Sequence, residues 1–249
     1  MLFRNRELDR AFEFISHTDF DIFCLQEVPD SFLPRLTALP HHLAETIDVD
    51  RLFEEPKRNH LVILSTFPIR GTGTIPFPDY WDTLPWRAKL LVRVLRPLGW
   101  SKIANRSALY ADLETPRGVV RVFNLHLILA TPHRRLSEFE EAMAQRDPAD
   151  PAIVCGDFNI IESPRVSLLN WISGAALTEA VFYKNERATI EARFATHGLT
   201  NPLRGKTTHA FGGSQLDHIL ISKEFAVREA HVVPERFGSD HHPVRVDIE

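Results

Sequence analysis

Residues 152–159 read Ala-Ile-Val-Cys-Gly-Asp-Phe-Asn, an apolar run that ends in a carboxylate and an amide. The run Ala152–Cys155 is short and rich in β-branched residues, and this composition predicts a strand. Because apolar residues occupy successive positions, other elements should cover both faces of that strand. The stretch therefore predicts a layered α/β fold in which the sheet holds Asp157 and Asn159 rigidly at its edge.

Other short apolar runs predict further strands, at Ile22–Leu25, Leu61–Leu64, Ala108–Leu113, Val119–Leu127, His218–Ile221 and Val244–Ile248. Helical patterns alternate with these runs, at residues 7–15, Arg134–Ala144, Pro164–Ile172 and Glu186–Phe194. Ser163 and Pro164 are typical of an N-cap and a first helical position. We find no internal repeat, low-complexity tract or linker, so we expect residues 1–249 to form a single domain.

The composition is that of a globular protein: of 249 residues, 44% are hydrophobic and 25% charged, with a formal net charge of −4. These values argue against a disordered, collagen-like or disulfide-scaffold protein. A mildly acidic chain is not expected to bind nucleic acid over its whole surface, although it can still carry a local basic groove. Cys24 and Cys155 lie in apolar runs and are expected to be buried free thiols, which suits a reducing compartment.

No apolar stretch reaches the length that spans a bilayer, and the first residues lack the continuous apolar region of a signal peptide. We therefore expect a cytoplasmic protein without a transmembrane segment, and a monomer.

Four more apolar runs border polar groups: Leu-Gln-Glu-Val at 25–28, Asn-Leu-His-Leu at 124–127, Leu-Asp-His-Ile-Leu at 216–220 and Ser-Asp-His-His-Pro-Val at 239–244. One Glu after a strand is usually a solvated turn residue, but five such clusters in one chain indicate a functional site. The oxygen ligands suit Mg²⁺ or Mn²⁺, and they come from Glu27, Asp157, Asn159 and Asp240. Groups for proton transfer and charge neutralisation are supplied by His126, His241 and Asp217. Such a set is typical of metal-assisted attack of water on a phosphoester.

In this order, the strings LQEV, ILSTFPI, NLHL, GDFN, LDHILIS and SDHHPV resemble the endonuclease/exonuclease/phosphatase superfamily, which includes deoxyribonuclease I and exonuclease III. The resemblance runs from about Leu8 to the C-terminus. It implies a four-layer α-β-β-α sandwich of two mixed sheets. It also implies an enzyme that hydrolyses a phosphodiester bond with Mg²⁺ or Mn²⁺ as its cofactor.

The resemblance further implies how the site would hold metal and phosphate. Glu27 would be the principal metal ligand, and Asp240 would lie beside the metal. His241 would contact the scissile phosphate, and Asp217 would orient that imidazole through a hydrogen bond.

It implies roles for the remaining members of the set as well. Asp157 would position or deprotonate the attacking water, and Asn159 would hold that water or a phosphate oxygen. His126 would stabilise charge on the phosphoryl oxygens. His218 is expected to pack rather than react, and His209, which has no motif around it, is expected to be a surface or structural residue.

The segment near 78–106 is expected to be an insertion that contacts the substrate. It has no acidic residue from Thr83 to Ala111, yet it is rich in cations and tryptophans: Arg87, Lys89, Arg93, Arg96, Lys102, Arg106, Trp81, Trp86 and Trp100. Base stacking together with phosphate pairing would bind a nucleic acid, our first expectation, and the substrate-binding cations would be Arg87, Arg93, Arg96 and Arg106.

Three alternatives stay open for this segment and for the chain. An anionic lipid or phosphoinositide is the second candidate substrate, because the segment mixes apolar and basic residues as interfacial helices do. A structural interpretation makes Trp86–Leu95 a cationic amphipathic helix with buried tryptophans. A catalytically silent binding module is the remaining function class.

Members of the resembled superfamily begin with a strand that carries an Asn and precedes the first helix. Here the helical pattern starts at Leu8, and the residues ahead of it are too few for a strand, its turn and the start of a helix. Asn5 directly precedes the helix and is not expected to replace that Asn. The fold is therefore predicted to lack its first strand, or Met1 is not the native start, and the metal site would be one ligand poorer.

Overall fold

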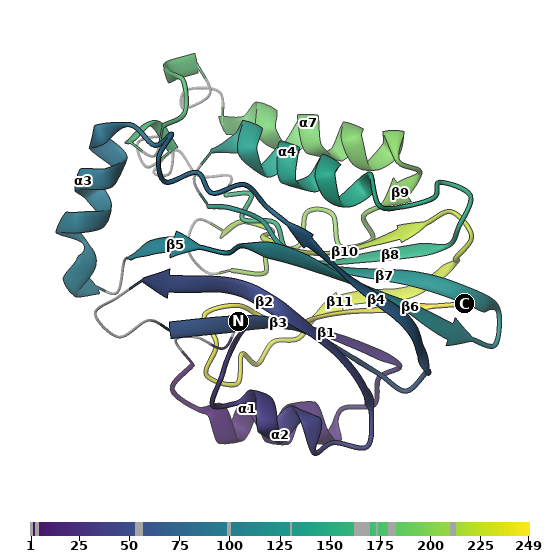
Figure 1. Ribbon diagram of the computed structural model, residues 1–249. Coiled ribbons are helices and arrows are strands. Elements are labelled where there is room, and N and C mark those ends of the chain that lie inside the picture. The colour runs from purple at the N-terminus through teal and green to yellow at the C-terminus, as the bar shows by residue number, and fades with distance from the viewer. Residues whose placement is uncertain are drawn as a thin grey trace.

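The computed structural model describes residues 2, 5–52, 57–98, 101–129, 131–161, 170–172, 174–178, 183–209 and 213–249. Its strands form two large sheets and a separate hairpin (Figure 1). The first sheet has the order β1-β3-β2-β5, with antiparallel strands Ile22–Pro29, Lys57–Ser65, His42–Leu52 and Lys102–Ala104. The hairpin joins β11 (Val227–Val232) to β12 (Val244–Ile248).

The second sheet has the order β4-β6-β7-β8-β10-β9, with strands Ile69–Pro76, Ser107–Thr115, Gly118–His126, Ala152–Asp157, Asp217–Ser222 and Leu199–Thr200. It is mixed, because β7 and β8 are parallel whereas its other pairs are antiparallel. The register pairs His126 with Asp157 and Asp157 with Asp217. Three predicted site residues therefore lie on adjacent strands at one end of this sheet.

Helices cover the outer face of each sheet (Figure 1). α1 (Leu8–His17) and α2 (Leu33–Thr37) lie against the first sheet, and α4 (Pro132–Met143) and α7 (Tyr183–Thr196) lie against the second. Between the sheets, Ile63 of β3 belongs to one buried cluster with Ala111 of β6 and Ile153 of β8. The predicted order of layers, helix, sheet, sheet and helix, is confirmed.

The first sheet differs from the prediction in one respect, because it is wholly antiparallel and not mixed. Among the described strands β12 pairs with β11 and belongs to neither large sheet. Among the described residues no strand precedes α1, so β1 and β12 have no common neighbour that could join them. The predicted helix Pro164–Ile172 lies mostly outside the described residues, of which 170–172 are helical.

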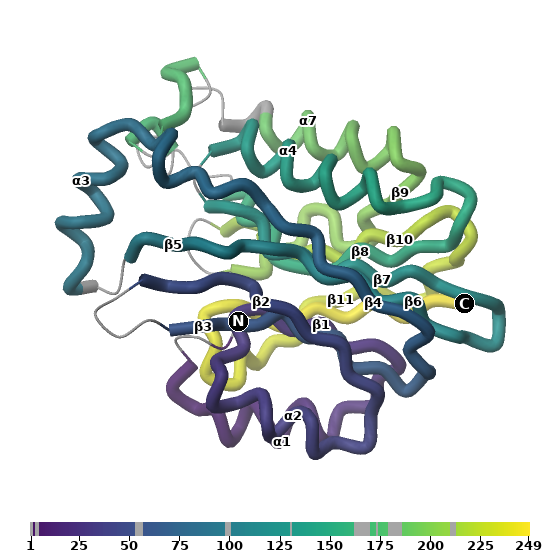
Figure 2. The backbone as a smooth tube through the Cα atoms, in the orientation of Figure 1, coloured from purple at the N-terminus to yellow at the C-terminus, as the bar shows by residue number. Residues whose placement is uncertain are grey.

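The basic segment forms α3 (Trp86–Val94), a 3₁₀ turn at Arg96–Leu98 and then β5. Figure 2 shows α3 standing at one end of the sandwich, beside β5 and the C-terminal end of β2. None of the helices in the described ranges is long and apolar enough to cross a membrane.

Candidate active site

Asp157 ends β8 at the centre of the site and is fully buried. Gly156 before it has a φ of 144°, and a Cβ there would lie 1.9 Å from the carbonyl oxygen of Leu125. Only glycine therefore allows β8 to approach β7 this closely. Oδ1 of Asp157 accepts the N–H of Asn159 at 2.8 Å, whereas Oδ2 has no hydrogen-bond partner in the described part of the chain.

The environment of Asp157 favours its protonated form. Burial, reinforced by the Asp217 carboxylate and opposed by the nearby imidazoles, raises the pKa of Asp157 above its ordinary value. Asn159 fixes the turn that follows, because its Nδ2 donates to the carbonyl oxygen of Leu127 at 2.8 Å. A carboxylate with one free oxygen and a raised pKa is suited to accept a proton from water.

Asp217 and His241 form a buried pair beside Asp157. Nδ1 of His241 lies 2.8 Å from Oδ2 of Asp217, and Oγ1 of Thr208 accepts the Asp217 N–H at 3.0 Å. Burial opposes ionisation of both groups, but their attraction outweighs it, so the pKa of Asp217 is lowered and the pKa of His241 is raised. Because Asp217 holds Nδ1, the opposite nitrogen of His241 is the one available to a substrate.

His126 forms a second pair of this kind with Asp48, a residue of β2 that the sequence did not single out. Nδ1 of His126 lies 2.9 Å from both carboxylate oxygens of Asp48, which is almost fully buried. Burial alone would favour the neutral ring. The negative charge of Asp48, with smaller contributions from Glu27 and Asp157, nevertheless raises the pKa of His126 to about 9. Nε2 of His126 lies 3.9 Å from Oδ2 of Asp157, so two imidazoles flank this carboxylate.

Glu27 joins the same network through its backbone. Its N–H donates to Oδ2 of Asp48 at 3.0 Å, and the strand is irregular here, with a φ of 55° at Glu27. Positive φ in a residue other than glycine is uncommon and occurs preferentially at functional sites. The Glu27 carboxylate pairs with Arg51 of β2. Gln26 donates to Asn124 at 2.7 Å, and this contact connects the two sheets beneath the site.

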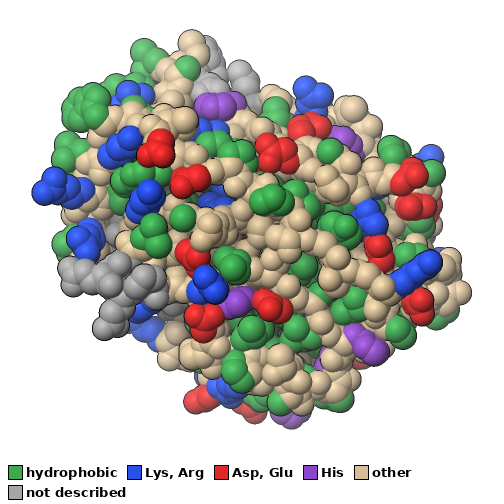
Figure 3. All heavy atoms as spheres, viewed as in Figure 1, with side chains coloured by type: hydrophobic (Ala, Val, Ile, Leu, Met, Phe, Trp, Pro, Cys, Tyr) green, Lys and Arg blue, Asp and Glu red, His purple; other side chains and the backbone are tan. Residues whose placement is uncertain are grey.

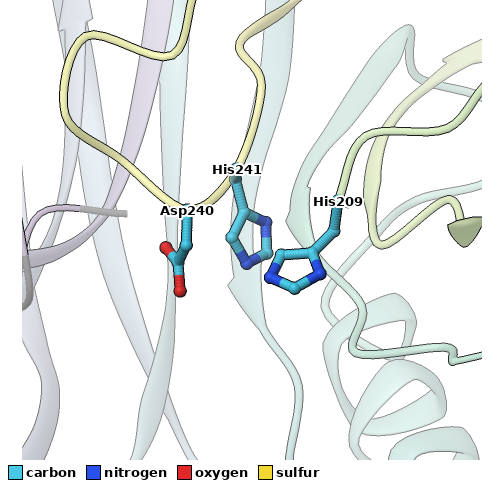
Figure 4. A group of neighbouring side chains, drawn as sticks. All are labelled: His209, Asp240 and His241. Carbon is cyan, nitrogen blue, oxygen red and sulfur yellow. The ribbon is translucent and has the colours of Figure 1, made fainter. Parts of the chain in front are cut away.

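Asp240 is exposed at the rim of the site, and it lies with His241 and His209 as Figure 4 shows. Ligand atoms of these three side chains lie within 4.8 Å of one another, as do those of Asp157, Asp217 and His241. His209 comes from the loop before β10, and its ring centroid lies 4.6 Å from that of His241. His209, which was expected to be a surface or structural residue, therefore lies at the rim of the site.

The donor set fits a divalent cation. Carboxylate and imidazole atoms converge around Asp157, and its buried Oδ2 lacks a hydrogen-bond partner among the described residues, as a ligand atom would. Neither group of converging atoms includes Glu27, whose carboxylate faces Arg51. The predicted pairing of Glu27 with Asp240 as metal ligands therefore remains a prediction, and a metal at Glu27 would have to compete with Arg51.

The cations of the basic segment divide into two groups. Arg106 is buried, pairs with Glu138 of α4, and donates to the carbonyl oxygen of His126 at 2.7 Å. Its predicted contact with the substrate is wrong, because this guanidinium is enclosed by the protein and holds β6 and β7 against α4. Arg87 and Arg93 of α3 and Arg96 are exposed or partly exposed, and Arg87 donates to the carbonyl oxygen of Trp171 at 2.9 Å.

α3 also presents apolar side chains to solvent, contrary to the structural interpretation. Trp86, Leu90 and Val94, spaced four residues apart on one face, are 74%, 49% and 63% exposed. Figure 3 shows apolar and basic side chains together at the left edge, where α3 lies in Figure 1. β5 pairs with β2 so that Ile103 opposes Arg51, and Arg51 contacts Glu27, so the segment borders the site end of the sheet.

A family comparison agrees with this geometry. The model of the endonuclease/exonuclease/phosphatase family matches residues 2–241. The chain belongs to this family. Its members are hydrolases that act on phosphoesters, and they generally depend on a divalent metal. No curated protein matches the sequence.

Solved structures of the family share the fold at low sequence identity. An endonuclease/exonuclease/phosphatase from Beutenbergia cavernae DSM 12333 has a TM-score of 0.64 at 18% identity, over 97% of this chain and 64% of that chain. This chain thus spans less than two thirds of the length of that relative. A mannosyl-6-phosphatase from Bacteroides thetaiotaomicron VPI-5482 has a TM-score of 0.58 at 19% identity, over 98% and 91%. A 3′ phosphatase from Neisseria, bound to product DNA hairpin, has a TM-score of 0.58 at 16% identity, over 98% and 94%.

Proposed function

We propose that the chain is a Mg²⁺- or Mn²⁺-dependent hydrolase of phosphodiester bonds. The observation that carries the proposal is the arrangement around Asp157. A buried carboxylate with one free oxygen lies between two imidazoles, each of which is held through Nδ1 by a carboxylate of its own. Such a centre can accept a proton from water and place positive charge against a phosphate.

Each side chain has a distinct task in this account. Asp157 accepts the proton of the attacking water, because its pKa is raised and its Oδ2 is free. His126 is protonated at neutral pH, because its pKa is about 9, and it stabilises charge on the phosphoryl oxygens. His241, with its Nδ1 held by Asp217, contacts the phosphate through its other ring nitrogen. Asn159 orients Asp157 through its backbone N–H.

A divalent cation would be held by the carboxylate of Asp240, whose oxygen lies near ligand atoms of His209 and His241, with Glu27 as the further ligand that the sequence predicts. When bound, it would neutralise charge on the phosphate and lower the pKa of a bound water.

The metal requirement is tested with bis-p-nitrophenyl phosphate as a generic diester. EDTA should abolish hydrolysis, and added Mg²⁺ or Mn²⁺ should restore it, while calorimetric Mn²⁺ titration reports binding without turnover. Asp240→Asn should weaken Mn²⁺ binding, whereas Asp112→Asn, which alters a carboxylate paired with Arg121 on β6 and β7, serves as the matched control. Hydrolysis that persists in EDTA would refute metal dependence.

Nucleic acid is the first candidate substrate. Its support is the exposed Arg93 of α3 and the exposed Arg96 after it, together with an exposed Trp86 that could stack on a base. A lipid or phosphoinositide headgroup is the second, and a specific observation favours it. Leu90 and Val94 expose apolar area that base stacking does not use but that a bilayer interface would cover.

Two variant pairs separate these substrates. Arg93→Glu with Arg96→Glu should raise KM for either polyanion, because both substrates are attracted by these charges. Leu90→Ser with Val94→Ser should raise KM only for a phosphoinositide in vesicles and leave single-stranded DNA unaffected. Steady-state kinetics of each variant pair on single-stranded DNA and on the phosphoinositide decides between the two substrates. If neither pair changes KM for either substrate, α3 does not contact the substrate.

A further inference from the structure

A hollow in the surface adjoins the active site at the start of α1. It has a volume of about 540 Å³ and lies between residues 6, 7 and 10 on one side and the turn 235–240 on the other. Asp240, which also lies beside His209 and His241, belongs to its lining. Ligand pockets in proteins usually have volumes of about 300–1,000 Å³. The hollow, which we call the α1 pocket, therefore has room for a further part of a substrate bound at Asp240.

The α1 pocket is lined by three arginines and three carboxylates: Arg6, Arg10, Arg236, Glu7, Glu235 and Asp240. Arg10 contacts both Glu7 and Glu235, so these two acidic side chains already share a cation. Arg6 and Arg236 are exposed, and their guanidinium groups have no hydrogen-bond or ion-pair partner in the described part of the chain. Both guanidinium groups are therefore available to an anion.

A metal at Asp240 would make the α1 pocket electropositive. Its arginines and carboxylates balance one another, so a divalent cation beside Asp240 would leave an excess of positive charge. The planar N–H donors of a guanidinium group match the oxygens of a phosphate, and an electropositive pocket attracts that anion. The pocket is therefore suited to a phosphate, and not to an apolar or cationic part of a substrate.

The turn that carries Arg236 is held in one conformation. The ring of Phe237 stacks on Phe14 of α1 with centroids 4.0 Å apart, and its carbonyl oxygen accepts a hydrogen bond from Nδ2 of Asn5 at 2.9 Å. A Cβ at Gly238 would lie 2.4 Å from Oδ1 of Asn5, so only glycine lets the turn lie this close to the start of α1. Phe237 itself has a φ of 50°, which is rare for a bulky residue and occurs preferentially at functional sites. This strained turn fixes the backbone of Arg236 at the mouth of the site.

We propose that the α1 pocket is a subsite for a second phosphate group of the substrate, carried by the same sugar or polyol ring as the scissile phosphate. Arg6 and Arg236 pair with this second phosphate while the scissile phosphate lies beside Asp240 and His241. The inference rests on the proposed function, and it narrows the substrate to a molecule with two neighbouring phosphates. A nucleotide with phosphates at its 3′ and 5′ positions and an inositol bisphosphate share this chemistry.

Two diesters that differ by one phosphate test the subsite. Thymidine 3′-phosphate 5′-(p-nitrophenyl phosphate) carries the second phosphate, and thymidine 5′-(p-nitrophenyl phosphate) lacks it. The parent chain should have a KM about fivefold lower for the first diester, with a similar kcat, because a contact away from the reacting bond binds the ground and transition states alike. The isomers in which the 3′ and 5′ groups are exchanged show on which side of the scissile bond the pocket lies. Equal KM values within both pairs of diesters would overturn the proposal.

Variants of the two free arginines assign the effect to the α1 pocket. In Arg6→Gln and in Arg236→Gln, the ratio of the two KM values should fall toward one, because each variant removes one cation that faces the second phosphate. Both side chains are exposed, so urea unfolding of these variants should match that of the parent chain. Arg70→Gln on β4 is the matched control and should retain the ratio, since Arg70 is likewise exposed but lies outside the pocket lining. A ratio that stays at the parent value in both pocket variants would contradict the proposal.

Competitive inhibition identifies the ring that carries the two phosphates. Thymidine 3′,5′-bisphosphate and inositol 1,4-bisphosphate are each compared with the corresponding monophosphate. A bisphosphate that inhibits about fivefold more tightly than its monophosphate, and loses this advantage in Arg236→Gln, supports the subsite and names its ring chemistry. If neither bisphosphate inhibits more tightly than its monophosphate, the proposal is overturned.

Failure of this proposal and failure of the proposed function give different results. If both diesters are hydrolysed with equal KM, the assigned reaction stands and the second-phosphate subsite does not. If neither diester is hydrolysed with Mg²⁺ or Mn²⁺, the assigned reaction fails. Calorimetric titration of thymidine 3′,5′-bisphosphate and inositol 1,4-bisphosphate into the Mn²⁺-loaded parent chain and the Arg236→Gln variant then still tests the pocket. Equal affinities of the two chains for both ligands would overturn the proposal in that case as well.

Discussion

Replacing Asp48 by Asn tests the electrostatic centre of the site. Asp48 holds Nδ1 of His126 and accepts the N–H of Glu27, and the substitution keeps the shape of the side chain while removing its charge. The pKa of His126 is about 9 in the folded chain against 6.5 ordinarily. At about 1.4 kcal/mol for each pH unit, this difference corresponds to about 3 kcal/mol in favour of the imidazolium.

The sign follows from the direction of the pKa. A folded-state pKa above the unfolded one stabilises the fold fully below pH 6.5, and the stabilisation is lost as the pH rises through 9. The free energy of unfolding of the parent chain should therefore fall by about 3 kcal/mol over that window. Asp48→Asn should abolish most of this fall, because burial then keeps the ring neutral.

Urea unfolding between pH 6.5 and 9.5 in EDTA measures the effect, and an NMR titration of the His126 ring locates its pKa. Asp50→Asn is the matched control on the same strand, since Asp50 pairs with Arg58 and Asn105 and not with His126. This control should lower the free energy of unfolding without changing how steeply that free energy varies between pH 6.5 and 9.5. If the unfolding free energy of the Asp48→Asn variant falls with pH as steeply as that of the parent chain, Asp48 does not raise the pKa of His126.

Three further predictions concern the side chains of Asp217, Arg106 and His218. Asp217→Asn should lower kcat by about 10²-fold with little change in KM, because His241 loses the carboxylate that orients it; steady-state kinetics with kcat within twofold of the parent chain would contradict this. Arg106→Met should lower the free energy of unfolding by about 3–5 kcal/mol, because it leaves the Glu138 carboxylate buried and unpaired, and Arg106→Met with Glu138→Leu should recover most of the loss in urea unfolding. If the double variant recovers no unfolding free energy, the loss in Arg106→Met does not come from an unpaired Glu138. His218 has its pKa lowered to about 3, because it is buried and lies 2.7 Å from a nitrogen of Arg187, so its stabilisation is intact above pH 6.5 and is lost as the pH falls toward 3. His218→Gln should reduce the slope of unfolding free energy between pH 6.5 and 4 by up to about 1.4 kcal/mol for each pH unit, and an unchanged slope would assign it to other groups.

The sequence was informative where polar residues directly border apolar runs. Asp157, His126 and Asp217 lie at strand ends, so the motifs and the register of β7, β8 and β10 describe the same three positions. The layers followed from the same apolar runs, and the family resemblance supplied their order.

The sequence did not predict the roles of Asp48, Arg106 and His209, and each has a physical reason. Asp48 lies within β2, where the charges at Glu45, Asp48 and Asp50 do not follow the alternation typical of a strand, and the pairing with β3 shifts register between Ile47 and Val49. A charged residue between Ile47 and Val49 was the one available signal. Arg106 was assigned to substrate because its partner Glu138 lies 32 residues away, a pairing that spacing along the chain does not reveal. The placement of His209 beside His241 likewise depends on a loop contact across the fold.

The role of Asp157 as proton acceptor is tested most directly by the rate of bis-p-nitrophenyl phosphate hydrolysis by the Asp157→Asn variant in Mg²⁺. We expect kcat to fall by about 10²-fold or more, because the variant cannot accept the proton of water, with Mn²⁺ binding still measurable. Asp112→Asn should retain the activity of the parent chain. An Asp157→Asn variant that is folded and as active as the parent chain would show that Asp157 does not accept this proton.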